Sequence, residues 1–128
     1  MSNSLRGAVP FEVDGVSHHL RLTTNAQAVY EDKAGEDVVT ALRAMFKAPN
    51  RRHVARVRRL FWAGLSHVPG MTEDVAGDMI DALGYSEANA IIGKAIALAM
   101  PELAAGNAPK AATQAAKTEP EPEATDAG

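Results

Sequence analysis

The sequence of 128 residues contains no cysteine, and only 5% of its residues are aromatic. The lack of cysteine excludes disulfide frameworks, thiolate zinc sites and cysteine nucleophiles. No apolar run approaches the roughly 20 residues that a membrane-spanning helix needs. The first seven residues also lack the apolar core of a signal peptide. We therefore expect one soluble, cytoplasmic domain without a membrane partner, whose core forms without disulfides or metals.

Recognisable catalytic and metal-binding motifs are lacking as well. The sequence contains no HExxH, no GxSxG and no glycine-rich phosphate loop. Its histidines are poorly placed to share a metal. His18 and His19 point to opposite faces of an expected strand, and His53 and His67 lie at opposite ends of an expected helix. We expect no enzyme activity and no cofactor, and we assign the histidines to surface or capping roles.

Charged residues are unevenly distributed, although the formal net charge is only -3. Five arginines lie within residues 51–59, and four acidic residues lie within residues 73–81. The small net charge provides no general attraction to nucleic acid. We favour the interpretation that the arginines pair with the acidic segment of the same molecule or with a partner protein.

The composition changes at residue 104. Residues 104–128 include no aromatic residue, Leu, Ile, Val or Met. Such a segment cannot bury enough apolar area to offset an ordering cost of about 1–2 kcal/mol per residue. We predict a folded domain over residues 1–103 and a disordered tail over residues 104–128.

Apolar periodicity and capping signals predict the secondary structure. Alternating apolar residues indicate an N-terminal β-hairpin with Asp14-Gly15 as a type I′ turn. Five helices follow, of which the third is expected over residues 51–68. Thr24 is the expected cap of the first helix, Thr72 of the fourth and Ser86 of the fifth. The predicted fold class is α+β, mainly α, with the hairpin packed on about five short helices.

Residues 60–67 and the fifth helix carry the largest apolar surfaces. The first segment contains the only tryptophan, and the fifth helix has only Asn89 and Lys94 as polar residues between positions 88 and 100. A helix that is apolar nearly all round is normally enclosed on every side. Either it is a plain core helix, or a partner or second copy covers part of it. The candidate partner-binding residues are Phe61, Trp62, Leu65, Met79, Ile92 and Ile96, with core packing as the alternative for each.

An arginine-bearing helix is also the best argument for nucleic-acid binding. Arg52, Arg56 and Arg59 share one face of the expected third helix and form the candidate basic patch. The fourth and fifth expected helices are arranged in sequence like a helix-turn-helix motif. The fifth, in the place of the recognition helix, offers only Asn89 and Lys94 for contacts with bases. A small DNA-binding regulator is therefore an alternative that we disfavour against protein binding.

The order of several landmarks resembles one known family. The landmarks are a hairpin with Asp14-Gly15, then Leu20-Arg21-Leu22-Thr23, Ala28-Val29-Tyr30-Glu31 before Gly35, Leu60-Phe61-Trp62-Ala63-Gly64-Leu65-Ser66-His67, Met71-Thr72, Leu83-Gly84-Tyr85, and a helix of small residues to Met100. Over residues 5–103 this set is similar to the small tail protein encoded beside the major tail protein in gene transfer agents and related long-tailed phages. That family is described both as tail assembly chaperones and as tail tube proteins.

The resemblance implies a non-enzymatic factor in tail morphogenesis. Tail assembly chaperones coat the long helical tape-measure protein and help the major tail tube protein to polymerise around it. They act in the cytoplasm of the host cell and are usually absent from the finished particle. The implied partners are thus the tape-measure protein and the major tail tube protein, with a homo-oligomer as a further option. A structural tube component is the alternative, but such subunits are built on a β-sandwich, whereas this sequence predicts two strands.

Overall fold

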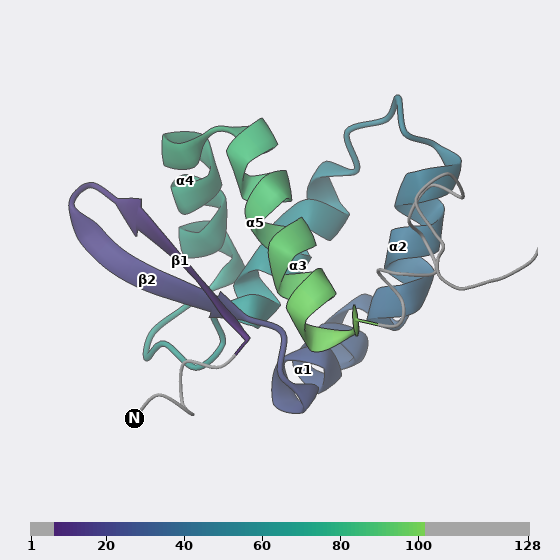
Figure 1. The fold of residues 1–128 in the computed structure, drawn as a ribbon, viewed down its shortest axis with the longest axis horizontal. Coiled ribbons are helices and arrows are strands. Elements are labelled where there is room, and N and C mark those ends of the chain that lie inside the picture. Colours follow the sequence, from purple (N-terminus) through teal and green to yellow (C-terminus); the bar gives the residue numbers. More distant parts are fainter. Residues whose placement is uncertain (1–6, 102–128) are drawn as a thin grey trace, which may run out of the picture.

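The computed structural model describes residues 7–101 as an antiparallel β-hairpin followed by five helices (Figure 1). In chain order the elements are β1 (Ala8–Val13), β2 (Val16–Arg21), α1 (Thr24–Ala34), α2 (Val38–Lys47), α3 (Val54–Gly64), α4 (Glu73–Leu83) and α5 (Tyr85–Ala99). The predicted fold class, α+β and mainly α, is confirmed. The tail predicted over residues 104–128 lies outside the described residues.

The hairpin turn is made by Asp14 and Gly15, as the sequence predicts. The register pairs Val13 with Val16, which leaves these two residues as the loop. Both have positive φ, 52° for Asp14 and 79° for Gly15, as a type I′ turn requires. Because such a turn matches the right-handed twist of the flanking strands, β1 and β2 pair along their whole length.

Thr23 caps the N-terminus of α1, one residue before the cap that the sequence suggests. Its side-chain oxygen accepts a hydrogen bond from the Ala26 backbone N–H at 3.1 Å. The Gln27 side chain donates to the Leu22 carbonyl at 3.1 Å instead of closing a capping box. The assignment of Thr24 as the cap is wrong, because Thr23 is the residue with the extended backbone that a cap needs.

The Thr23→Ala substitution is expected to lower the free energy of unfolding by about 1 kcal/mol, because a backbone N–H in the first turn of α1 loses its partner. Thr24→Ala is the matched control, and it should stay within about 0.5 kcal/mol of the wild-type protein. Urea unfolding followed by circular dichroism measures both values. A larger loss in Thr24→Ala than in Thr23→Ala would contradict the observed cap.

α4 and α5 follow each other with a single residue between them. Thr72 caps α4 as predicted, because its hydroxyl accepts from the Val75 backbone N–H at 3.1 Å. Gly84 separates the two helices, and its φ of 99° is one that residues with a side chain rarely adopt. α5 then begins at Tyr85 without a side-chain cap. The prediction of Ser86 as its cap is therefore wrong, since the glycine turn starts the helix earlier.

α3 is shorter than the helix predicted over residues 51–68. It begins at Val54 because His53 has a left-handed backbone, with φ of 52°, and a right-handed helix does not continue through such a residue. The His53 Nε2 lies 2.8 Å from a backbone carbonyl in the preceding loop, which holds the residue in place. Arg51 and Arg52 consequently precede α3 instead of lying on it.

The hydrophobic core lies between the helices and extends beneath the hairpin. Its largest fully buried side chains are Tyr30, Phe61, Leu20, Leu22, Leu60, Leu65, Ile91 and Val57. Figure 1 shows the hairpin and α2 at opposite ends of the molecule, with α3 and α5 between them. α3 contacts α1, α4 and α5, and α5 also contacts both strands. These two helices therefore connect the hairpin to the rest of the fold.

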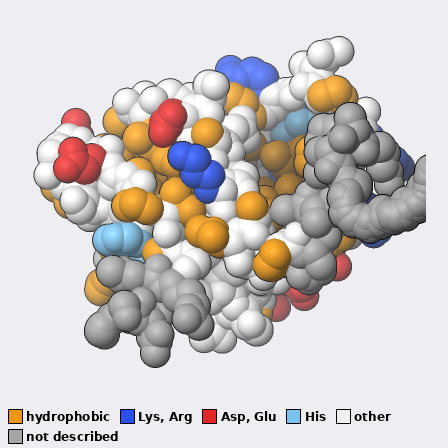
Figure 2. Space-filling view, in the orientation of Figure 1, with side chains coloured by type: hydrophobic (Ala, Val, Ile, Leu, Met, Phe, Trp, Pro, Cys, Tyr) orange, Lys and Arg blue, Asp and Glu red, His pale blue; other side chains and the backbone are white. Residues whose placement is uncertain are grey.

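α5 is buried on one face only. The buried residues are Ala88, Ile91, Ile92, Ala95 and Ile96. The exposed residues of the other face include Ala90, Gly93, Lys94, Ala97 and Leu98. Figure 2 shows hydrophobic side chains around a basic residue on this side of the molecule. Of the two alternatives for α5, a core helix enclosed on every side does not hold for residues 7–101, and whether a partner covers the exposed face stays a prediction. Within residues 7–101 no helix is long and apolar enough to cross a membrane.

Candidate functional site

Five of the six predicted partner-binding side chains lie in the hydrophobic core. Phe61 and Leu65 are 0% exposed, Ile92 is 2% exposed, and Met79 and Ile96 are each 6% exposed. For these five residues the alternative of core packing is confirmed, and they do not form an exposed surface. The apolar spacing that suggested such a surface instead marks the faces along which α3, α4 and α5 pack together.

Trp62 is the exception, because its side chain is only partly buried. It lines a surface groove of about 520 Å³ together with Met71 and charged residues that include Lys33, Arg59 and Glu73. The indole thus lies where the core meets solvent, between α3 and the loop before α4. Its role as a partner-binding anchor stays a prediction.

Two of the three arginines in the predicted basic patch are bound to carboxylates. Arg56 donates from Nε to the Glu36 Oε2 at 2.8 Å and from Nη2 to the Oε1 at 3.0 Å. Arg59 donates from Nε to the Glu73 Oε2 at 3.4 Å. The interpretation that the arginines pair within the molecule is confirmed for Arg59, whose partner begins the acidic α4. The pairing of Arg56 with Glu36 is not suggested by the sequence.

Glu36 links α1 to α3 through a single carboxylate. The Tyr30 hydroxyl donates to it at 2.7 Å, beside the guanidinium of Arg56. Hydrogen bonds from Arg56 hold the pKa of Glu36 below its ordinary value; the bond from Tyr30 adds to this effect, and burial opposes it. Burial raises the pKa of the Tyr30 hydroxyl, and the neighbouring Glu36 raises it further. The phenol therefore keeps the proton that it donates to Glu36.

The stabilising effect of Glu36 is expected to depend on pH. Because its pKa is lower in the folded than in the unfolded protein, its contribution is complete above the unfolded value of about 4.5 and is lost as the pH falls through the folded value. Glu36→Gln should cost about 1 kcal/mol at pH 7, and the difference from wild type should shrink below pH 4. Urea unfolding across this range measures it, with the exposed Glu31→Gln as control. A pH-independent difference would contradict the assignment.

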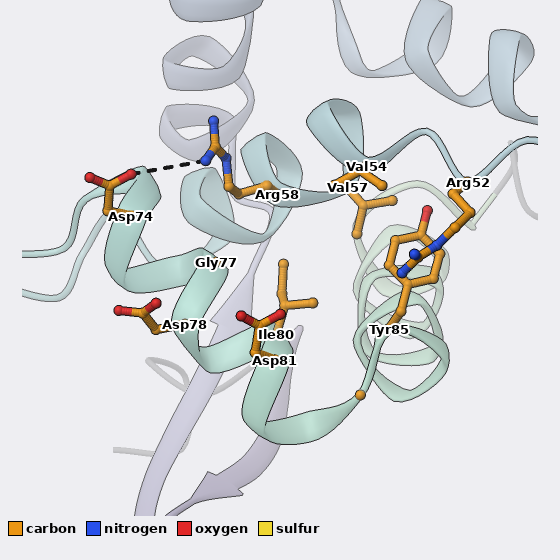
Figure 3. A pocket seen from close by; sticks show the side chains of 11 residues that line it. Arg52, Val54, Val57, Arg58, Asp74, Gly77, Asp78, Ile80, Asp81 and Tyr85 are labelled. Atoms are coloured by element: carbon orange, nitrogen blue, oxygen red, sulfur yellow. Dashed lines mark ion pairs between the residues drawn. The ribbon is translucent and has the colours of Figure 1, made fainter.

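A larger groove is lined by α3 and α4 on the surface where they pack together, and it ends at the start of α5 (Figure 3). It has a volume of about 620 Å³, and its apolar lining includes Val54, Val57 and Ile80. Val54, the first residue of α3, is 54% exposed. At one end of the groove the Arg52 guanidinium lies over the Tyr85 ring, 4.4 Å from its centroid. The groove thus exposes apolar surface to solvent beside a stacked cation.

Two glycines line this groove. A Cβ at Gly77 would lie 3.2 Å from the Arg58 Cδ, and a Cβ at Gly84 would have no atom within 4 Å. Because Gly77 has no side chain, the stem of Arg58 lies against α4. Its guanidinium is 3.6 Å from a Glu73 oxygen and 3.9 Å from an Asp74 oxygen. Arg58 is therefore engaged with acidic residues at the beginning of α4.

The α4 wall of the groove is acidic. Asp74, Asp78 and Asp81 line it (Figure 3), and their spacing of four and three residues places them on one side of the helix. Asp74 is paired with Arg58. Asp78 and Asp81 are exposed and form no ion pair with any residue between 7 and 101. Two unpaired carboxylates therefore line the α4 side of the groove, whose apolar floor is formed by Val54, Val57 and Ile80.

Of the residues in this groove, the sequence predicts only Arg52 as functional. The regular spacing of the aspartates is visible in the sequence, but any solvated helix face has similar spacing. The exposure of Val54 is not visible, because it depends on α3 starting late, after the left-handed His53. A glycine within an otherwise helical pattern, Gly77, is the one signal that indicates a close approach or an open surface here.

Comparison with known proteins identifies no relative. No family model, curated protein or solved structure matches the chain. Within the described part of the chain, no group of three His, Cys, Asp or Glu side chains is arranged to hold a metal ion.

Proposed function

We propose that the protein is a tail assembly chaperone, which binds the tape-measure protein and helps the major tail tube protein to polymerise around it. The observation that carries the proposal is the open groove lined by α3 and α4, which contains the exposed Val54 on the α3 side and two unpaired carboxylates on the α4 side. Amphipathic helices bind other proteins by placing their apolar face in grooves of this kind. A long helical tape-measure protein would offer many such faces. The landmarks that resemble the tail-protein family favour the same role.

A structural tail tube component is the competing assignment within that family. Its subunits are built on a β-sandwich, whereas the described residues contain a single sheet of two strands. Each strand has six residues, and a lone hairpin of that length offers little sheet for a ring wall. We therefore favour the chaperone, which would act in the host cytoplasm and be absent from the finished particle. Rings or tubes formed by the purified protein alone would support the tube component instead.

A small DNA-binding regulator is the alternative from another class. Its candidate surface consists of Arg52, Arg56 and Arg59, but two of these are bound to carboxylates. Phosphates would have to displace those carboxylates. We expect duplex DNA to bind only weakly, with an affinity that falls steeply with salt. Tight binding that is lost when the three arginines are replaced by alanine would favour this alternative.

Co-expression with the long helical protein encoded downstream, in the position of a tape-measure gene, tests the proposed function. The two proteins should co-elute in size-exclusion chromatography with light scattering, and the partner should be insoluble when expressed alone. If the partner aggregates equally with and without this protein, the chaperone assignment is wrong. Light scattering of the purified protein alone also reports whether it forms a homo-oligomer.

A further inference from the structure

We infer that the groove between α3 and α4 selects a basic amphipathic helix. An apolar side chain of that helix would lie over Val54, and its lysines or arginines would face Asp78 and Asp81. The inference rests on the proposed function, in which the helix belongs to the tape-measure protein. It goes further by naming the binding surface and the charge of the segment that it accepts.

The groove exposes apolar surface at Val54. Val54 has no helical turn before it to cover its side chain, and the nearby Gly77 and Gly84 contribute no side chains of their own. The volume of about 620 Å³ falls within the range of roughly 300–1,000 Å³ typical of ligand-binding clefts. The groove therefore has room for more than one side chain of a partner.

The two unpaired carboxylates of α4 favour a positively charged partner. Asp78 and Asp81 are one helical turn apart on α4, so their carboxylates match cations that are three or four residues apart on a facing helix. A partner that covers the floor also removes water from these carboxylates. Desolvating an ionised group is unfavourable unless an opposite charge replaces the water. Of the two arginines that line the groove, Arg58 is paired with acidic residues at the start of α4, and Arg52 lies over the Tyr85 ring at one end. Along Asp78 and Asp81 the groove should therefore accept a basic helix and reject an acidic one.

The same charges disfavour other occupants. Residues 102–128 of this chain contain two lysines and five acidic residues, so this segment would be repelled by the acidic wall. Nucleic-acid phosphates would be repelled by Asp78 and Asp81 for the same reason. A second copy of the chain remains as a competing occupant, because its own arginines could meet the aspartates. The oligomeric state of the wild-type and charge-reversed proteins is therefore measured as well.

The first test uses two synthetic amphipathic peptides of about 18 residues, long enough to form a helix on binding. Both carry the same leucine stripe, flanked by lysines in one and by glutamates in the other. The full chain should bind the lysine peptide at least about tenfold more tightly, a difference of about 1.4 kcal/mol. Asp78→Lys/Asp81→Lys should reverse this preference. Glu31→Lys/Asp32→Lys makes the same charge change on the exposed side of α1, away from the groove, and should leave the preference unchanged.

A second pair of variants tests the apolar floor. Val54→Ser should weaken binding of the lysine peptide, whereas Val75→Ser should not, because Val75 is an exposed valine on α4 that does not line the groove. Both valines are exposed, and substitutions at exposed positions usually change stability little, so folding should be retained. Equal affinity of the wild-type protein for both peptides, or no binding of either, would overturn the inference.

Co-expression separates failure of this inference from failure of the proposed function. If the tape-measure protein co-elutes with the wild-type protein but not with Asp78→Lys/Asp81→Lys, both are supported. If it co-elutes equally with both, the groove is not the binding surface although the chaperone function stands. If it co-elutes with neither, the proposed function fails. A wild-type dimer that becomes monomeric in the charge-reversed variant would show that a second copy occupies the groove, which overturns the inference.

Discussion

Replacing Phe61 by alanine is expected to lower the free energy of unfolding by about 3–5 kcal/mol, a large part of the stability of a domain of this size. The side chain of Phe61 is 0% exposed. Its ring lies 5.4 Å from the ring of Phe11 on β1, and the Phe11 ring stacks on His18 of β2. Removing it would leave a cavity between α3 and the hairpin, and a lone hairpin is only marginally stable in water.

Phe46→Ala is the matched control for this substitution. Phe46 also lies on a helix, but it is 61% exposed, so its removal should change the free energy of unfolding by no more than about 0.5 kcal/mol. Urea denaturation of both variants, followed by the fluorescence of Trp62, gives the two values. Equal losses in the two variants would show that α3 does not hold the hairpin in the way described here.

Gly64→Ala is expected to destabilise the protein by about 2 kcal/mol through overpacking. An added Cβ would lie 2.6 Å from the Leu20 Cγ and 2.7 Å from its Cδ2. Leu20 is fully buried in the core, so its side chain has no free space into which to move. This strain outweighs the gain of up to about 1 kcal/mol in helix propensity that alanine provides over glycine.

A double-mutant cycle tests whether the clash with Leu20 causes the destabilisation by Gly64→Ala. Leu20→Ala alone should cost about 2–5 kcal/mol because it leaves a cavity. In that background the added methyl group at position 64 should be neutral or stabilising, because it enters the vacated space. The sign of the Gly64→Ala effect should therefore change between the two backgrounds. Additive effects would show that the strain arises elsewhere.

The sequence was sufficient to predict the hairpin and the number of helices because these depend on local patterns. Asp14-Gly15 has a backbone preference that specifies the turn, and Thr72 caps α4 with its own side chain. The predicted cap of α1 is wrong because two adjacent threonines compete for that position. The predicted cap of α5 is wrong because the tight turn at Gly84 starts the helix without a side-chain cap. The start of α3 depends on the left-handed backbone of His53, which no local pattern reveals.

The candidate site was predicted less well, because exposure is a property of the packed fold. Apolar spacing identifies Phe61 and Ile92 as members of a helix face, and in a small domain that face is the core. Val54 instead owes its exposure to its place at the start of α3, directly after the left-handed His53. Unpaired charges such as Asp78 are recognised only when the positions of all the arginines are known.

Site-specific photo-cross-linking during co-expression tests the central claim most directly. A photoreactive phenylalanine analogue is placed either at Val54, in the groove, or at Phe46, a similarly exposed apolar position outside it. We predict that position 54 cross-links to a lysine- or arginine-rich helical segment of the tape-measure protein, whereas position 46 does not. Cross-linking from position 46 alone, or equally from both positions, would contradict the claim that the groove between α3 and α4 is the binding surface.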